Sequence, residues 1–356
     1  MSPRTPALLG AYVLPGPAMD PTVCVAQTTE AERLGLGSVW LSELQGPLKD
    51  AGALCGYMGH ATSTIGFGTS ITHFGTRHPM ALASWGATMQ VLTGGRFLFG
   101  FGRSTARRWR QWGVPEPTLR SMADSADILR RLWNHEPVSY SGPAGDFPEL
   151  DWGHFPDVTP PPLLLAAIGP KTLELGGSHF DGVFLHPFLS PEGVERSVAL
   201  VRAGAERAGK DPVSVTVYHE LVVAPDMSDA EVDAAVRARA AAYFSGAGYG
   251  ELILRANGWD AEPLGPFREA VRQATADNEA AGSPLKGREV LVEPSRLLPD
   301  RFFAEGAAVG SAKDCARRIH DFLDAGADQL IVHGVTPDAL GPTVAAFAPE
   351  AGKEGK

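Results

Sequence analysis

Polar and ionisable side chains lie at the ends of several apolar segments of this chain. Ser42 and Glu43 lie at the end of one such segment, and residues 70–73 and Arg77 lie at the end of the next. Carboxylates and imidazoles at such positions can transfer protons, and an arginine can hold an anion. These residue types predict acid–base or redox chemistry beside a polar ring, although a polar loop that only begins the next helix would contain them too.

Similar residues follow the later apolar segments. They are Gly102, Arg103, His186, Glu220 and His333. The histidines do not have the HExxH spacing of a zinc enzyme, and no GxSxG turn is present. The sequence therefore predicts neither a metal site nor a hydrolase triad.

The stretch Ala167-Ile168-Gly169-Pro170-Lys171 combines an apolar segment, a glycine and a proline that can begin a helix. Free amides and the dipole at a helix N-terminus favour a phosphate, and Lys171 adds a positive charge. A plain strand-to-helix turn would have the same residues, so both interpretations stay open. The stretch matches neither GxGxxG nor the Walker pattern.

These residues need strands and helices to position them, and the chain alternates the two. Strands are expected at 8–14, 38–42, 64–72, 97–101, 163–168, 181–185, 213–223 and 328–332. Helices are expected between them, including one from Pro79 with Leu82, Trp85, Met89 and Leu92 on one stripe. The strands read as continuous apolar runs, which is typical of parallel strands that helices cover on both faces.

Eight strands favour an α/β fold of the (β/α)8 TIM-barrel type over an open doubly wound sheet. Two insertions interrupt the alternation. Residues 137–162, after strand four, should form a hairpin and loop, and residues 245–310, between helix seven and helix eight, a long polar segment with one helical piece near 267–281. We expect a single domain over 1–356, with 245–310 covering the active face.

Composition excludes several classes of protein. The net charge of −10 argues against nucleic-acid binding. No run of 18 apolar residues and no signal-peptide pattern are present, which predicts no membrane span. Three widely spaced cysteines, Cys24, Cys55 and Cys315, cannot form a disulfide framework. The sequence therefore predicts a cytoplasmic enzyme.

The motifs resemble those of the luciferase-like monooxygenase superfamily, in its coenzyme F420-dependent branch. The strongest match is GTSITHFGTRHPMALASWGATMQVLTGGRFLFGFGRS at 68–104. LGLGSVWLSE at 34–43, AAIGPKTLELGG at 166–177, DGVF at 181–184 and the segment 306–334 follow the family's order. The resemblance therefore extends over nearly the whole chain.

The resemblance implies a flavin or deazaflavin ring at the carboxyl ends of the strands. It implies a non-prolyl cis peptide at Ser70–Ile71 that supports this ring. The residues implied to contact the ring and its phosphate tail are Ser42, Glu43, Ser70, Ile71, Thr72, Gly102, Arg103, Ala167, Ile168, Gly169, Pro170 and Lys171.

The sequence departs from the family pattern at two positions. Leu44 stands where many deazaflavin members have a histidine, and Ser104-Thr105 stands where some have a glutamate. A proton donor must then lie elsewhere. The catalytic candidates are Glu43, His73, His186 and His333, with Glu220 as a further possible donor.

These features predict an oxidoreductase that transfers a hydride between coenzyme F420 and a small organic substrate. One alternative is an FMN-dependent monooxygenase supplied by a separate reductase, and another is a catalytically silent flavin-binding protein. A phosphate-binding aldolase-type barrel would need a lysine inside a strand, and the predicted strands offer none. Homodimers are common in the family, so we also expect a homodimer.

Overall fold

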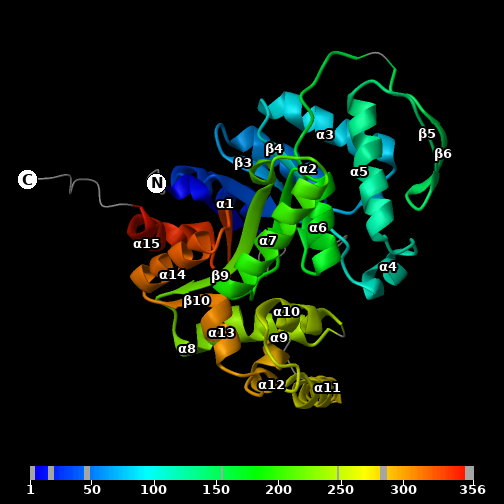
Figure 1. The fold of residues 1–356 in the computed structure, drawn as a ribbon. Coiled ribbons are helices and arrows are strands. Elements are labelled where there is room, and N and C mark those ends of the chain that lie inside the picture. Colours follow the sequence, from blue (N-terminus) through cyan, green and yellow to red (C-terminus); the bar gives the residue numbers. More distant parts are fainter. Residues whose placement is uncertain are drawn as a thin grey trace, which may run out of the picture. The chain divides into compact units, whose positions relative to one another are not determined.

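The computed structural model describes residues 5–14, 20–43, 49–153, 155–246, 248–280 and 287–348. The chain divides into two compact units, one formed by residues 10–184 and 200–216 and the other by residues 1–9, 185–199 and 217–356. The predicted alternation of strands and helices runs through both units (Figure 1). The expectation of a single domain stays a prediction.

The unit formed by residues 10–184 and 200–216 is built on consecutive strands of one sheet. Their order is β1 (Leu9–Tyr12), β2 (Ser38–Leu41), β3 (Gly66–Thr69), β4 (Phe97–Phe101), β7 (Leu163–Ala167) and β8 (Gly182–Leu185). The pairs from β1 to β7 are parallel. Every residue of β2 and β8 is buried, as expected for strands with helices on the outside. The parallel order brings the carboxyl ends of these strands to one edge.

The helices of this unit follow their strands. They are α1 (Thr22–Arg33), α2 (Ala51–Ala61), α3 (Pro79–Thr93), α4 (Ala106–Trp112), α5 (Leu119–Trp133), α6 (Pro170–His179) and the second half of α7 (Pro191–Arg207), with short 3-10 turns η2 (Phe74–Thr76) and η3 (Pro212–Ser214). The alternation predicted a helix between β2 and β3 but gave no bounds for α2, and the sequence did not predict α4. On α3, Leu82 and Met89 are buried as expected, but Leu92 is 72% exposed. The hairpin expected in 137–162 is confirmed as β5 (Val138–Gly142) and β6 (Gly145–Leu150).

The other unit is organised around β9 (Thr216–Pro225). Two strands pair with β9 in parallel, β10 (Ala307–Gly310) and β11 (Gln329–His333). Ile331 of β11 lies opposite Glu220 of β9. The sequence did not predict β10. A short turn, η1 (Pro6–Leu8), precedes β1 at the start of the chain.

The helices after β9 differ most from the sequence prediction. They are α8 (Asp229–Val232), the π-helical turn η4 (Asp233–Arg237), α9 (Ala238–Phe244), α10 (Tyr249–Asn257), α11 (Leu264–Ala280), η5 (Glu289–Leu291), α12 (Val292–Ser295), α13 (Arg301–Gly306), α14 (Ala312–Asp324) and α15 (Pro337–Phe347). The helical piece expected near 267–281 is confirmed as α11, but the sequence did not predict the other helices between residues 245 and 310. This segment forms several short helices, and only α11 was foreseen.

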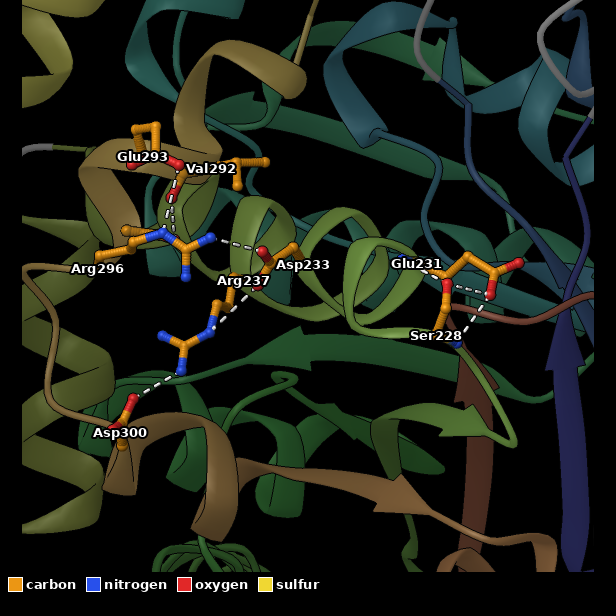
Figure 2. Close-up of polar contacts among 9 residues, drawn as sticks. Ser228, Glu231, Asp233, Arg237, Val292, Glu293, Arg296 and Asp300 are labelled. Carbon is orange, nitrogen blue, oxygen red and sulfur yellow. Dashed lines mark hydrogen bonds and ion pairs between the residues drawn. The ribbon is translucent and has the colours of Figure 1, made fainter.

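Ion pairs connect the π-helical turn to these short helices (Figure 2). Asp233 accepts hydrogen bonds or ion pairs from Arg237 at 3.4 Å and from Arg296 at 2.8 Å. Arg237 also reaches Asp300 at 2.6 Å. Figure 2 also shows the capping box of Ser228 and Glu231, which begins α8. These ion pairs link η4 to Arg296, directly after α12, and to Asp300, directly before α13.

Candidate active site

A buried charged cluster lies at the ends of β2 and β3. Glu43 is 2% exposed, and the guanidinium of Arg77 contacts both of its carboxylate oxygens, with Nη1–Oε2 at 2.6 Å and Nη2–Oε1 at 2.5 Å. The Thr72 hydroxyl donates to the same carboxylate. A bidentate arginine and a hydroxyl donor fix the carboxylate in one orientation. Glu43 therefore lies where the sequence placed it, but its charge is matched by Arg77.

The tip of β3 has the backbone that the family resemblance implied. The Ser70–Ile71 peptide is cis, so that prediction is confirmed. The hydroxyl of Tyr12 donates to the carbonyl oxygen of Ser70. On β4's side, a Cβ added to Gly102 would lie 2.1 Å from Cδ1 of Ile71. Glycine at this position therefore leaves the space in which the Ile71 side chain lies.

His73 packs against two tryptophans of α4. Its ring meets Trp109 at 5.5 Å and Trp112 at 4.8 Å between centroids, both edge-on. It is 2% exposed, and its Nδ1 has no hydrogen-bond partner among the described residues. Burial lowers the pKa of His73 to about 4, while the charge of Glu43 opposes this shift. His73 is thus neutral near pH 7.

The remaining predicted residues of this unit fall into three environments. Ser42 is half-buried beside Glu43. Arg103 is half-exposed and pairs with Glu116 at 2.9 Å, so its charge is already balanced. At the start of α6, Gly169 is the N-cap without a side-chain cap and Pro170 is the first helical residue.

The start of α6 thus has the geometry that the sequence predicted for a phosphate site. Ala167 ends β7 and Ile168 lies between strand and helix. Uncapped amides at a helix N-terminus can accept an anion. The side chain of Lys171, however, lines a groove of about 680 Å³ along α5, α6 and α7. In that groove Arg207 and Glu174 form an ion pair at 3.0 Å.

The unit built on β9 holds a second polar cluster. Nε2 of His333 lies 3.4 Å from a carboxylate oxygen of Glu220, and Nη1 of Arg239 lies 3.2 Å from Nδ1 of His333. Arginine can only donate, so Nδ1 of His333 accepts and Nε2 carries the hydrogen that faces Glu220. Burial lowers the pKa of His333, and Glu220 opposes this shift. The structure therefore brings together two of the predicted candidates.

His186 directly follows β8 and belongs to the same unit. Its ring lies edge-on to Tyr243 at 4.6 Å and to Tyr249 at 5.0 Å between centroids. Burial lowers the pKa of His186 to about 4, and the charge of Glu220 opposes this. The candidates therefore form two groups, each within one unit.

Sequence reasoning missed several residues of these groups. Arg239, Tyr243 and Tyr249 were not among the predicted site residues. Arg239 and Tyr243 are four residues apart on α9, so they lie on one face of that helix. That spacing, on a helix predicted after β9, could have indicated their position. The position of Leu44 lies outside the described residues.

Metal and thiol chemistry find no support in the described part of the chain. It contains no group of three or more His, Cys, Asp or Glu side chains that could hold a metal ion. Cys24, Cys55 and Cys315 are buried free thiols. Burial raises the pKa of Cys24 and of Cys315 to about 11. Within the same residues, no helix is long and apolar enough to cross a membrane.

The fold is a (β/α)8 barrel. The coenzyme F420-dependent tetrahydromethanopterin reductase of Methanopyrus kandleri matches this chain with a TM-score of 0.76 at 20% identity, covering 96% of this chain and 97% of that one. A monooxygenase of Streptomyces bottropensis matches with a TM-score of 0.63 at 20% identity, covering 95% and 97%. The barrel predicted from the sequence is confirmed.

The chain belongs to the luciferase-like monooxygenase family, whose profile it matches over residues 4–329. Among curated relatives, the 5,10-methylenetetrahydromethanopterin reductase of Methanolobus tindarius is 26% identical over 315 residues, which are 88% of this chain and 90% of that protein. The family resemblance drawn from the sequence motifs is therefore confirmed.

Proposed function

We propose that this protein is a coenzyme F420-dependent oxidoreductase that transfers a hydride to or from a small organic substrate. The observation that carries the proposal is the buried carboxylate of Glu43 at the ends of β2 and β3, which Arg77 and the Thr72 hydroxyl hold in one orientation. The similarity to the F420-dependent reductase of M. kandleri and to the reductase of M. tindarius supports the choice of cofactor.

The residues proposed to hold the cofactor are those that the family resemblance implied. Ser42, Glu43, Ser70, Ile71, Thr72, Gly102 and Arg103 would surround its ring, and Ala167 to Lys171 its phosphate-bearing tail. When bound, coenzyme F420 supplies a carbon centre that exchanges a hydride, a two-electron step. The protein's part is to fix the orientation of the ring, hold the substrate beside it and move a proton.

The ion pair of Glu43 and Arg77 fixes a carboxylate beside the proposed ring site. A carboxylate oriented by a bidentate arginine keeps its position when a ligand enters, because the arginine fork is rigid. We therefore assign Glu43 a positioning role toward the ring.

A titration with both cofactors tests the proposal. Purified protein is mixed with oxidised coenzyme F420 and, separately, with FMN, and binding is followed by absorbance and fluorescence. We expect saturable binding of F420 with the stronger affinity. Saturable binding of neither cofactor would refute the proposal.

The FMN-dependent monooxygenase is kept as the second candidate because a monooxygenase of S. bottropensis shares the fold over nearly the whole chain. Such an enzyme would need a separate reductase to supply reduced FMN. Consumption of O2 in the presence of reduced FMN, without turnover of F420, would favour it. Binding of either cofactor without turnover of any substrate panel would favour a catalytically silent flavin-binding protein.

We also propose that the chain forms a homodimer through α2 and α3, which pack side by side. Although 20% of the chain's residues are charged, neither the 11 residues of α2 nor the 15 of α3 include Asp, Glu, Lys or Arg. Large apolar side chains lie exposed on these helices: Tyr57 is 57%, Val91 65% and Leu92 72% exposed. Exposed apolar surface of this kind marks an interaction site.

A second copy is the partner that this face fits best. Each chain has a net charge of −10, so two copies can approach closely only through a face that has no charge. In a two-fold dimer the same patch meets itself, and an uncharged apolar face is complementary to itself. Helices of 11 and 15 residues lying side by side cover an area on the order of 20 by 20 Å. The accessible surface of their side chains is larger than this flat area and approaches the ~800 Å² per partner of a stable interface.

The buried free thiols support a reducing, cytoplasmic location.

A further inference from the structure

The guanidinium of Arg77 contacts an aromatic ring as well as carboxylates. Its Cζ lies over the ring of Trp85, 5.0 Å from the ring centroid. A cation over the face of a tryptophan is attracted by the negative electrostatic potential of that face. Arg77, in the loop that leads into α3, is thereby held by a side chain of α3 itself.

The position of the Trp85 ring is fixed by the elements beside it. The ring meets Phe97 at 5.8 Å and Phe99 at 4.8 Å between centroids, both on β4. On the side of α2, a Cβ added to Gly52 would lie 3.7 Å from Cε2 of the ring. The indole Nε1 is buried and has no hydrogen-bond partner among the described residues. Packing of the ring, and not its N–H, therefore holds Trp85 in place.

Trp85 restrains Arg77 more strongly than the second carboxylate does. Nη2 of Arg77 lies 3.4 Å from Asp50, whose side chain is 65% exposed. Exposed ion pairs contribute little, because water screens the two charges. Asp50 is also engaged as the N-cap of α2, where it accepts from the amide of Ala53 at 2.8 Å. The side chain of Arg77 is only 23% exposed, and a cation–π contact is stronger where water is excluded.

The orientation of the guanidinium decides how Glu43 is held. Arg77 can contact both oxygens of Glu43 only when its planar fork faces the carboxylate. An arginine side chain has several rotatable bonds, so an ion pair by itself leaves other rotamers open. The face of Trp85 favours the rotamer in which the fork meets Glu43.

We propose that Trp85 is a positioning residue for the cofactor. Its ring face holds the guanidinium of Arg77 in the orientation that fixes the Glu43 carboxylate beside the deazaflavin ring. This inference rests on the F420-dependent function proposed above, in which Glu43 orients that ring. Trp85, Arg77 and Glu43 all belong to the unit formed by residues 10–184 and 200–216.

A plain core role for Trp85 is the alternative, because the sequence places it on one stripe of α3 with Leu82 and Met89. Those two residues are 1% and 4% exposed, whereas Trp85 is half-buried. A core role would limit the effect of Trp85 to the stability of the fold. A positioning role predicts a change in Arg77 and in cofactor affinity that a loss of stability does not explain.

A second cation–π pair in the same unit separates the two roles. Cζ of Arg96 lies over the ring of Phe67, 5.4 Å from its centroid. Arg96 donates to backbone carbonyls and to the Thr62 hydroxyl rather than to a carboxylate. Removal of the Phe67 ring therefore costs a contact of the same kind without an effect on Glu43.

The experiment combines titration of the full chain with F420 and ¹⁵N NMR of the arginine side chains in the cofactor-free chain. Trp85→Leu removes the ring face, Trp85→Phe keeps an aromatic face and loses no hydrogen bond, and Phe67→Leu is the matched control. We expect separate Nη1 and Nη2 resonances of Arg77 in the wild type and in Trp85→Phe. In Trp85→Leu they should broaden or merge, because a released guanidinium rotates about its Nε–Cζ bond.

Trp85→Leu should weaken binding of F420 by about 2–10-fold, as for the loss of one partly buried cation–π contact. Trp85→Phe should stay within about twofold of the wild type. Phe67→Leu should unfold at lower urea concentration and leave both F420 affinity and the Arg77 resonances unchanged. If Trp85→Leu does not fold, Trp85→Met is measured in its place.

Unchanged Arg77 resonances or unchanged F420 affinity in Trp85→Leu would overturn the proposal. An equal loss of affinity in Phe67→Leu would also overturn it, because the effect would then follow from stability. So would an equal loss in Trp85→Phe, which keeps the aromatic face. Failure of the wild-type chain to bind F420 would instead refute the proposed function, and the Arg77 resonances would still show whether Trp85 holds the guanidinium.

Discussion

Replacement of Leu92 by glutamate should convert the proposed homodimer to monomers. Leu92 is 72% exposed in the isolated chain, and full burial of a leucine side chain stabilises by roughly 1.5–3 kcal/mol, so covering its exposed part contributes about 1–2 kcal/mol. A two-fold interface contains the residue twice, which gives about 2–4 kcal/mol. Since about 1.4 kcal/mol is a factor of ten, losing these contacts alone raises the dissociation constant roughly 30- to 1000-fold.

The introduced carboxylate adds to this effect. Two glutamates in an apolar interface without a cationic partner are desolvated at a cost of several kcal/mol each. The total predicts that Leu92→Glu is monomeric at micromolar concentration, where the wild type is dimeric. Raising the salt concentration should strengthen the wild-type dimer, because it screens the repulsion between two chains of net charge −10.

Analytical ultracentrifugation over a dilution series measures both effects. Val213→Glu is the matched control, because Val213 is 76% exposed on η3, away from α2 and α3. Both variants should unfold at the temperature of the wild type, which shows that the fold is intact. The reasoning is refuted if Leu92→Glu dimerises as well as Val213→Glu does, or if the wild type is a monomer throughout the series.

Three further substitutions test the site and the core. Gly102→Ala places a Cβ 2.1 Å from Cδ1 of Ile71, so the Ile71 side chain must move; cofactor affinity in titrations should fall, and urea unfolding should show a loss of about 1–3 kcal/mol from overpacking. Arg77→Met leaves the buried Glu43 carboxylate without its partner, and urea unfolding should show a loss of about 3–5 kcal/mol. His219 is fully buried, and burial lowers its pKa from 6.5 to about 3, so it binds a proton in the unfolded but not the folded chain between these values. The contribution of His219 to the free energy of unfolding is complete above pH 6.5 and is lost toward pH 3, at up to about 1.4 kcal/mol per pH unit. In His219→Leu the free energy of unfolding, measured between pH 3 and 6.5, should therefore depend less steeply on pH.

The strands were predictable because each is an apolar run long enough to cross the sheet. Phe97–Phe101 was predicted with the bounds that the structure has. Where the prediction failed, a local turn overrode the apolar run. The strand expected from Val213 begins only at Thr216, because the Asp211 side chain accepts from the Val213 amide and starts the 3-10 turn η3. Val213 is consequently exposed to solvent.

The bounds of α2 escaped prediction because this helix lacks the alternation of apolar and polar faces on which such predictions depend. Its sequence, AGALCGYMGHA, contains three glycines and no charged residue. Gly59 is needed there, since a Cβ would lie 2.7 Å from Cζ of Phe67 on β3. An outer helix without a charged face is what the proposed dimer requires. The feature that hid α2 from prediction is therefore the one that supports its role as an interface.

The four catalytic candidates could not be ranked from the sequence, because each is a polar residue that follows an apolar strand. What separates Glu43 from His186 is a partner distant in the chain: Arg77 lies 34 residues after Glu43 and engages both of its oxygens. The spacing of residues along the sequence does not predict a pair so far apart in the chain.

Glu43→Gln keeps the shape of the side chain but removes the charge that balances Arg77. The buried guanidinium is then left without its counter-ion, and unfolding in urea should show a loss of about 1–3 kcal/mol. Titration should also show weaker binding of F420, because Glu43 is proposed to orient the ring. Unchanged F420 affinity in Glu43→Gln would contradict that role.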